Sequence, residues 1–195
     1  MIKKKELEAL KPYPVFTARD LADTLHKGID YAYLVAHRLK KAGVLHEIEK
    51  GKYTLETDSF LVASWIVWPS YISCWAALNY HKLTEQLPFT IHVITTRKRK
   101  KKIVSYGNAR IEFIKIKETA FTGFQRTTYQ GREIFLAEKE KAIVDALATR
   151  KMSLAEAVDI IKNNKRKINR DRLLLHAKKA RGWAKKLREA LHAQA

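Results

Sequence analysis

Residues 17–55 constrain the fold most, because two short helical patterns are followed there by an alternating hairpin pattern. Thr17 and Asp20 have the spacing of a capping box, so a helix is expected to begin directly after Thr17. Gly28 then suits a turn between two packed helices. A second helix is expected over residues 30–42, where a following glycine would end it.

The second helix has an apolar stripe on one side and a polar face on the other. The stripe consists of Ala32, Val35, Leu39 and Ala42. The polar face carries Tyr31, Tyr33, His37, Arg38, Lys40 and Lys41. Two alternating segments then flank Lys50, Gly51 and Lys52, which predicts a β-hairpin with a basic tip. Helix, turn, second helix and basic hairpin together predict a winged helix-turn-helix.

The formal net charge of the 195-residue chain is +19, which predicts a polyanionic partner, either nucleic acid or an anionic membrane surface. The charge is unevenly distributed. Residues 1–56 contribute +3, residues 57–147 contribute +6, and residues 148–195 contribute +10. Contact with DNA is therefore not expected to end with the winged helix.

The apolar stretches and the cysteine content predict the cellular compartment of the protein. The longest apolar stretch, around residues 60–68, is too short to span a bilayer, and no signal-peptide pattern opens the chain. Cys74 is the single cysteine, so no intramolecular disulfide is expected, which fits a reducing cytoplasm. The Cys74 side chain is interpreted as a small buried hydrophobe. No Cys or His pairs have the spacing of a structural zinc site, and neither a metal nor a cofactor is predicted.

A new apolar pattern begins after a polar joint at residues 56–59, and residues 57–195 are expected to fold as a unit of their own. Residues 121–128 are interpreted as a loop. Helices are predicted at 71–83 and 138–147, and strands at 90–95, 103–106, 110–116 and 133–136.

Six consecutive basic residues separate the first two of these strands. They are Arg97, Lys98, Arg99, Lys100, Lys101 and Lys102. Their mutual repulsion predicts an exposed loop. A solvated connection and a set of contacts to nucleic-acid phosphates both explain the run. No aromatic residue is interleaved to suggest base stacking.

The last 48 residues are predicted to be helical throughout and strongly basic. Ser153 and Glu156 have the spacing of a capping box at the start of one helix. A heptad-like seam follows, and its members are Leu173, Ala177, Ala180, Ala184, Leu187 and Leu191. The seam is expected to pack on the chain's own body in preference to a partner.

Three blocks of sequence, taken in order, resemble a known family. After the winged helix come Tyr71-Ile72-Ser73, Ala76-Ala77-Leu78, His81-Lys82-Leu83 and Val93-Ile94-Thr95, and then the helix at 138–147. Over roughly residues 15–148 the chain resembles the AbiEi family of abortive-infection antitoxins. Members of that family are the transcriptional-regulator half of type IV toxin–antitoxin operons. Many of them have His-Gly-Leu where this chain has His81-Lys82-Leu83.

The resemblance implies an N-terminal DNA-binding domain followed by an α/β antitoxin domain. Together with the residue patterns, this predicts an α+β fold with three parts: a winged helix-turn-helix at 1–56, an α/β antitoxin domain at 57–148, and a basic helical segment at 149–195 that packs on that domain. The last segment lies beyond the residues that carry the resemblance. The resemblance also implies repression of the protein's own operon through inverted repeats in double-stranded DNA, bound as a monomer or weak dimer. It further implies neutralisation of a nucleotidyltransferase-like toxin encoded next door, without a stable complex between the two proteins.

Candidate DNA contacts follow from the expected winged helix, whose second helix enters the major groove. Contacts to base edges or sugars are expected from Tyr31, Tyr33 and His37. Contacts to phosphates are expected from Lys27, Arg38, Lys41, Lys50 and Lys52. The two tyrosines can equally pack on the first helix, and Arg38 and Lys41 can be plain solvated charge.

Two other functional classes remain open. A nuclease or nucleotidyltransferase with a DNA-targeting head would need clustered carboxylates for its metal ions, and the middle region has no such motif. Glu138, Lys141 and Asp145 are better explained by charge pairing on a helix than by catalysis. A basic RNA-binding protein is the third class. The favoured interpretation is a cytoplasmic DNA-binding regulator without catalytic residues.

Overall fold

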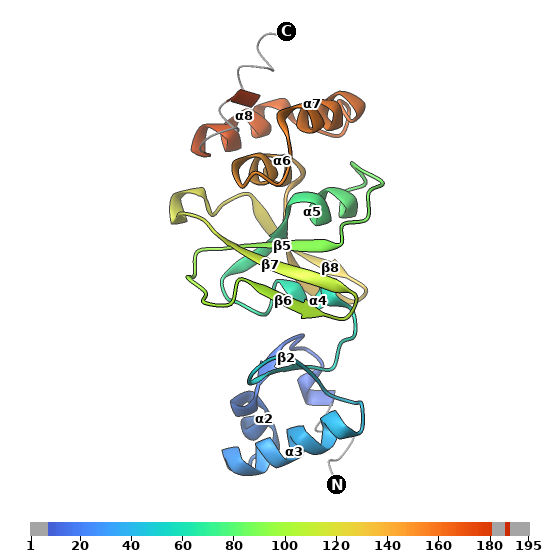
Figure 1. Cartoon of the computed structure of the whole chain (residues 1–195), viewed down its shortest axis with the longest axis vertical. Coiled ribbons are helices and arrows are strands. Elements are labelled where there is room, and N and C mark those ends of the chain that lie inside the picture. The colour runs from blue at the N-terminus through green and yellow to red at the C-terminus, as the bar shows by residue number, and fades with distance from the viewer. Residues whose placement is uncertain (1–7, 181–185, 188–195) are drawn as a thin grey trace.

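The computed structural model describes residues 8–180 and 186–187 of a mixed α+β chain. It contains a three-stranded and a six-stranded sheet, each with its own hydrophobic cluster. Figure 1 shows the smaller sheet with the first helices at one end of the molecule and the last helices at the other. The predicted α+β class is confirmed. None of the helices in the described residues is long and apolar enough to cross a membrane.

The N-terminal unit combines two helices with the three-stranded sheet. Its helices are α2 (Ala18–Leu25) and α3 (Ile29–Lys41). Its strands are β1 (Phe16–Thr17), β2 (His46–Glu49) and β3 (Lys52–Thr54). The strands are antiparallel in the order β1-β3-β2, and β2 contains a register shift between Glu47 and Glu49 that leaves Ile48 as an extra residue.

Local signals position the two helices. The Thr17 hydroxyl accepts a hydrogen bond from the Asp20 backbone N–H, and the Asp20 carboxylate accepts one from the Thr17 N–H at 2.7 Å, which confirms the predicted capping box. The apolar stripe of α3 differs from the prediction at its end. Ala36 is buried, whereas Ala42 is the exposed C-cap residue, because the chain turns away from the small core there.

The six-stranded sheet has the order β6-β7-β5-β4-β9-β8. Its strands are β4 (Ser70–Ser73), β5 (Thr90–Thr95), β6 (Ile103–Tyr106), β7 (Ala109–Lys115), β8 (Phe124–Tyr129) and β9 (Arg132–Ala137). The pairs β4/β9 and β5/β7 are parallel and the others antiparallel. The four strands predicted from alternation are confirmed.

The prediction of one helix over 71–83 was wrong at its start. Tyr71 and Ile72 lie in the central strand β4, fully buried, and helix α5 (Cys74–Tyr80) begins only afterwards. A strand buried on both faces has no alternation to distinguish it from a buried helix. The expected burial of Cys74 is confirmed.

The prediction of a loop over 121–128 was also wrong, because residues 124–129 form β8. This strand lies at the edge of the sheet and pairs only with β9 within the described residues. Its exposed side chains are polar, so it lacks the apolar alternation that identified the other strands.

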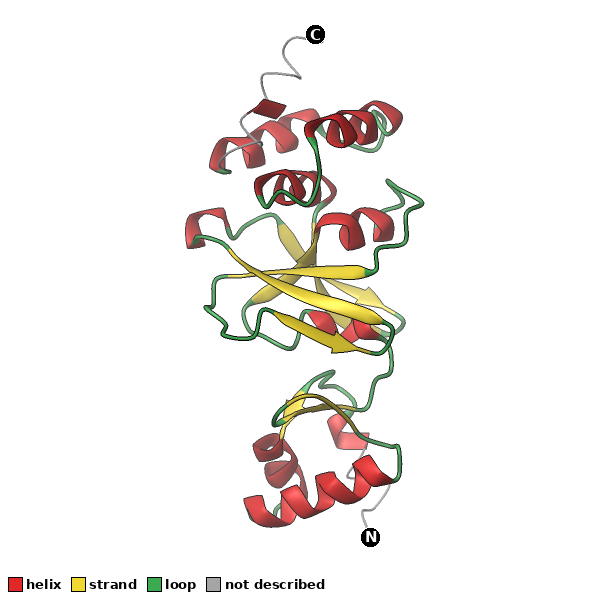
Figure 2. Ribbon diagram, in the orientation of Figure 1, coloured by secondary structure: helices red, strands yellow, loops and turns green. Residues whose placement is uncertain are grey.

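Helices cover one side of the larger sheet and extend away from it, as Figure 2 shows for α5 and the three last helices. The remaining helical elements are α4 (Ser59–Ala63), η1 (Glu118–Ala120), α6 (Lys139–Ala148), α7 (Leu154–Asn163) and α8 (Arg170–Lys179). The predicted helix at 138–147 and the capping box at Ser153 are confirmed. Helix α8 packs on α6.

The heptad-like seam is not one continuous helix. Leu173, Ala177 and Leu187 are buried, but Ala180 is an extended residue that ends α8. The other two members of the seam, Ala184 and Leu191, lie outside the described residues.

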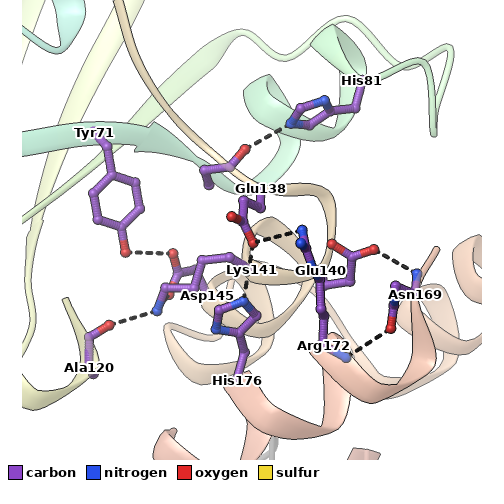
Figure 3. Close-up of polar contacts among 11 residues, drawn as sticks. Tyr71, His81, Ala120, Glu138, Glu140, Lys141, Asp145, Asn169, Arg172 and His176 are labelled. Atoms are coloured by element: carbon purple, nitrogen blue, oxygen red, sulfur yellow. Dashed lines mark hydrogen bonds and ion pairs between the residues drawn. The ribbon is translucent and has the colours of Figure 1, made fainter. Parts of the chain in front are cut away.

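A buried carboxylate connects α6 to the centre of the sheet (Figure 3). Asp145 is 3% exposed and accepts hydrogen bonds from the hydroxyls of Tyr71 and Ser73 at 2.9 and 2.8 Å. The Lys141 ammonium lies 2.8 Å from the other Asp145 oxygen and also donates to the Ala120 carbonyl. Strand β4, helix α6 and η1 are thereby held at one point.

Neighbouring charges on α6 hold α8 in place. The Glu140 carboxylate accepts a hydrogen bond from the backbone N–H of Asn169, the N-cap residue of α8, at 2.7 Å. Glu138 lies 3.5 Å from Nε2 of His176 and 3.8 Å from Arg172 (Figure 3). The acidic and basic residues that could suggest catalysis thus have structural partners.

Asp145→Leu should lower the free energy of unfolding by about 3–5 kcal/mol, because it leaves the buried Lys141 ammonium without its carboxylate. The double variant K141M/D145L should be clearly more stable than D145L alone, because no buried charge is left unpaired. Urea denaturation followed by circular dichroism measures both. Glu8→Leu, in an exposed ion pair with Lys11, serves as the control and should change stability little. A double variant no more stable than D145L would contradict the assignment.

Candidate nucleic-acid interface

Helix α3 lies at the end of the molecule opposite to α7 and α8 (Figure 1). It has a polar face of exposed side chains. The predicted contact residues on it are exposed: Tyr31 (42%), Tyr33 (52%), His37, Arg38 and Lys41. Lys27, in the turn before α3, is exposed as well. The sequence left open whether the two tyrosines pack on the first helix. Each has about half of its surface free.

The exposed residues divide into a centre and two flanks, because an α-helix has about 3.6 residues per turn. His37 and Lys41 lie one turn apart, opposite the buried Ala32–Val35–Ala36 side. Tyr31 and Arg38 flank them on one edge, and Tyr33 flanks them on the other. The face therefore offers aromatic and basic groups across its whole width.

Sequence reasoning missed an apolar member of this face. Leu34 is 45% exposed and lies one turn before His37 and Arg38. Ile29 is 40% exposed at the start of the helix but lies on the side of the buried Ala32 and Ala36. Apolar side chains on such a helix can contact thymine methyl groups in a major groove. The available signal was that Leu34 falls outside the apolar stripe.

Lys40 differs from its neighbours on α3 because it is engaged within the N-terminal unit. Its ammonium forms an ion pair with Glu47 on β2. This hydrogen bond is the main reason that the pKa of Glu47 lies below its ordinary value and that of Lys40 above it. The pair links the hairpin to α3 at the surface of the unit, above the core in which Leu45 and Tyr53 are buried together with α3.

The two predicted DNA-binding lysines of the hairpin differ, because Lys52 contacts the second unit and Lys50 does not take part in that contact. Lys50 at the tip is exposed. Lys52 instead lies 3.0 Å from Glu49 and donates to the backbone carbonyl of Ile66 in the second unit. Ile48 is 5% exposed and belongs to the larger hydrophobic cluster. The expectation that residues 57–195 fold alone did not include this contact.

The six basic residues form an exposed loop between β5 and β6, as predicted, with one exception. The Arg99 side chain is only 13% exposed. Its guanidinium donates two hydrogen bonds to Glu49, the shorter at 2.6 Å, and lies 4.2 Å from the centre of the Phe113 ring. Arg99 therefore joins the loop to the hairpin, while Arg97, Lys98, Lys100, Lys101 and Lys102 remain exposed.

Charge pairing also lowers the pKa of Glu49. Burial disfavours its ionised form, but hydrogen bonds from Arg99 and Lys52 outweigh burial and hold the pKa of Glu49 below its ordinary value. Arg132 makes a second contact between the units, 2.9 Å from Glu56, and the Tyr106 hydroxyl donates to the Glu56 carbonyl.

A groove of about 650 Å³ lies beside the basic loop. Four of its lining side chains are Arg97, Lys98, Arg99 and Lys102 of the loop. Lys115 at the end of β7 and Lys151 after α6 add two more cations. Glu112 also lines the groove and pairs with Lys151 at 2.8 Å. The groove is thus strongly basic and has one carboxylate on its wall.

Neither a metal-holding group of side chains nor an ionised thiol is found in the described part of the chain. Among residues 8–180 and 186–187, no group of three His, Cys, Asp or Glu side chains is placed to hold a metal ion. Burial raises the pKa of the Cys74 thiol, so the sulfur is not a thiolate at neutral pH. Burial likewise raises the pKa of Tyr71, and Asp145 adds to the shift.

Comparison with known proteins gave no further indication of function. No protein-family model matches the chain, and no curated protein is significantly similar to it. The candidate interface therefore depends on geometry and on the sequence resemblance.

His92 on β5 should make the protein less stable in mild acid. Burial lowers its pKa to about 4, Glu112 opposes this shift, and Lys151 adds to it. The unfolded chain takes up the proton near pH 6.5 and the folded chain only near pH 4. The free energy of unfolding should therefore fall as pH decreases from 6.5 to 4.

In His92→Gln this part of the pH dependence should be shallower, as measured by urea denaturation at several pH values. His81 and His176, whose pKa values burial also lowers, contribute equally to both proteins. Equal slopes in the two proteins would contradict the assignment to His92.

Proposed function

We propose that the protein is a DNA-binding transcriptional regulator that uses α3 as its recognition helix. The observation that carries the proposal is the exposed aromatic and basic face of α3, at an end of the molecule where the larger sheet does not cover it (Figure 1). A duplex can approach this face without rearrangement of the fold.

We further propose that residues 8–55 are a winged helix-turn-helix. Helical residues 8–10, then β1, α2, α3, β2 and β3, follow in the order expected for that motif, and the sheet order β1-β3-β2 fits it. In this form of the motif the hairpin turns toward the protein's own sheet, so DNA contact depends on α3, on Lys27 and on Lys50 at the tip.

The wider role comes from the sequence resemblance to the AbiEi family. By that resemblance the protein is the antitoxin of a type IV toxin–antitoxin system, represses its own operon and counteracts a nucleotidyltransferase-like toxin in the cytoplasm. The proposal involves no catalysis by this chain. A gel-shift series with the DNA upstream of its own gene tests the regulatory part. Expression with an adjacent toxin gene, scored by growth, tests the antitoxin part.

A basic RNA-binding protein is the second candidate, favoured by the net charge of +10 in residues 148–195. Tighter binding of folded RNA than of duplex DNA would support it. Divalent-metal-dependent cleavage or nucleotide transfer by the purified protein would instead favour an enzyme.

Binding to duplex DNA should weaken steeply with salt, because lysine and arginine side chains displace counterions from phosphates. About eight phosphate contacts give a slope near −7 for log K against log salt concentration. Fluorescence anisotropy at several salt concentrations measures it. A slope near zero would contradict the proposal.

His37→Ala and Tyr33→Ala should each reduce discrimination between operator and random DNA by about tenfold, because both side chains are exposed on the face of α3 that is proposed to enter the DNA major groove. Tyr13→Ala is the matched control, since Tyr13 is equally exposed but lies outside α3. Competition gel shifts measure the ratio.

Neutralising the exposed loop residues should weaken operator and random DNA alike, with Arg99 left intact because it holds the hairpin. The variant carries alanine in place of Arg97, Lys98, Lys100, Lys101 and Lys102. A loss confined to the operator would show that the loop reads sequence.

A further inference from the structure

Arg99 lies where the basic groove meets the N-terminal hairpin. It lines the groove together with Lys98 and Lys102, and the same guanidinium pairs with Glu49 at 2.6 Å. Its position is fixed from the other side by Phe113, whose ring centre is 4.2 Å away. Any anion in the groove therefore lies next to the ion pair that joins the two units.

The groove has more positive charge than its own carboxylate can balance. Glu112 is occupied by Lys151 at 2.8 Å. Within the part of the chain that the structure describes, no acidic side chain forms an ion pair with Lys98, Lys102 or Lys115. The Arg97 side chain donates only to the Trp68 carbonyl, at 3.4 Å, among the described residues.

The size and chemistry of the groove indicate the class of ligand. A volume of about 650 Å³ falls in the range of small-molecule sites. Three unpaired ammonium groups and a guanidinium can neutralise a chain of phosphates, whereas a single carboxylate would leave most of them unpaired. Phe113 is covered by Arg99 and is not free to stack on a base.

We propose that this groove binds a ligand with neighbouring phosphate groups, of the size of a nucleoside triphosphate, and that the bound phosphates compete with Glu49 for Arg99. A second acceptor on the Arg99 guanidinium weakens its pairing with Glu49. Occupation of the groove therefore loosens the hairpin, and with it α3, from the larger sheet.

Linkage makes this coupling measurable without DNA. If the ligand weakens the pair between Arg99 and Glu49, removal of Glu49 must strengthen ligand binding by the corresponding factor. The ligand site is independent of the proposed role of α3, so failure of DNA binding would leave it unaffected.

The test uses the full chain, with ATP and inorganic tripolyphosphate as separate probes in isothermal titration calorimetry. The variant K98A/K102A/K115A should bind both at least about tenfold more weakly, because three charge-assisted contacts are lost. The control K117A/K178A/K179A removes the same charge from exposed lysines outside the groove and should bind within about twofold of the parent. Equal binding of the two probes would show that the phosphates alone are recognised.

Glu49→Gln should tighten binding of either probe about three- to tenfold. Arg99 stays over Phe113, and the phosphates no longer compete with a carboxylate for its guanidinium. Unchanged affinity in E49Q would overturn the coupling. Absence of binding at millimolar probe, or equal loss in the groove and control variants, would overturn the site. A single-stranded oligoribonucleotide that binds where neither probe does would also overturn it and assign the groove to a nucleic-acid backbone.

Discussion

The larger unit depends on the hydrogen bonds and the ion pair of the buried Asp145 carboxylate. This carboxylate is buried, yet it accepts hydrogen bonds from Tyr71, Ser73 and Lys141, which come from the central strand and from its own helix. A buried charge is tolerated only when such partners satisfy it. The helix that carries it also binds α8 through Glu138 and Glu140, so the order of sheet, α6 and last helices is set by polar contacts as well as by apolar packing.

The two units are joined in a different way, through the β2–β3 hairpin. Ile48 supplies the apolar part of this joint and Glu49 the ionic part. The proposed recognition helix is in turn held to the hairpin by the small hydrophobic core, and the pair between Lys40 and Glu47 links them at the surface. A path therefore leads from the basic groove to α3 through two side-chain ion pairs, Arg99–Glu49 and Glu47–Lys40, which the backbone of β2 connects.

Much of the fold could be predicted, because its signals are local. The capping boxes at Thr17 and Ser153 depend on residues three positions apart, and the confirmed strands alternate within a few residues. Strand β4 could not be predicted, since burial on both faces removes alternation, nor could the polar edge strand β8. The same holds for the site. Exposure of the α3 face followed from its period, whereas the pairing of Arg99 with a residue 50 positions away leaves no local signal.

The register shift in β2 has a consequence for how the two units stay attached. A regular strand sends successive side chains to opposite sides, so Ile48 and Glu49 could not both serve the larger unit in an unbroken ladder. The extra residue breaks that alternation, and both side chains contact the second unit while Glu47 keeps its place beside Lys40. Part of the attachment is therefore encoded in strand length: a hairpin shorter by one residue would retain every charge in the loop and the groove but could not direct both an apolar and an ionic side chain at the larger unit.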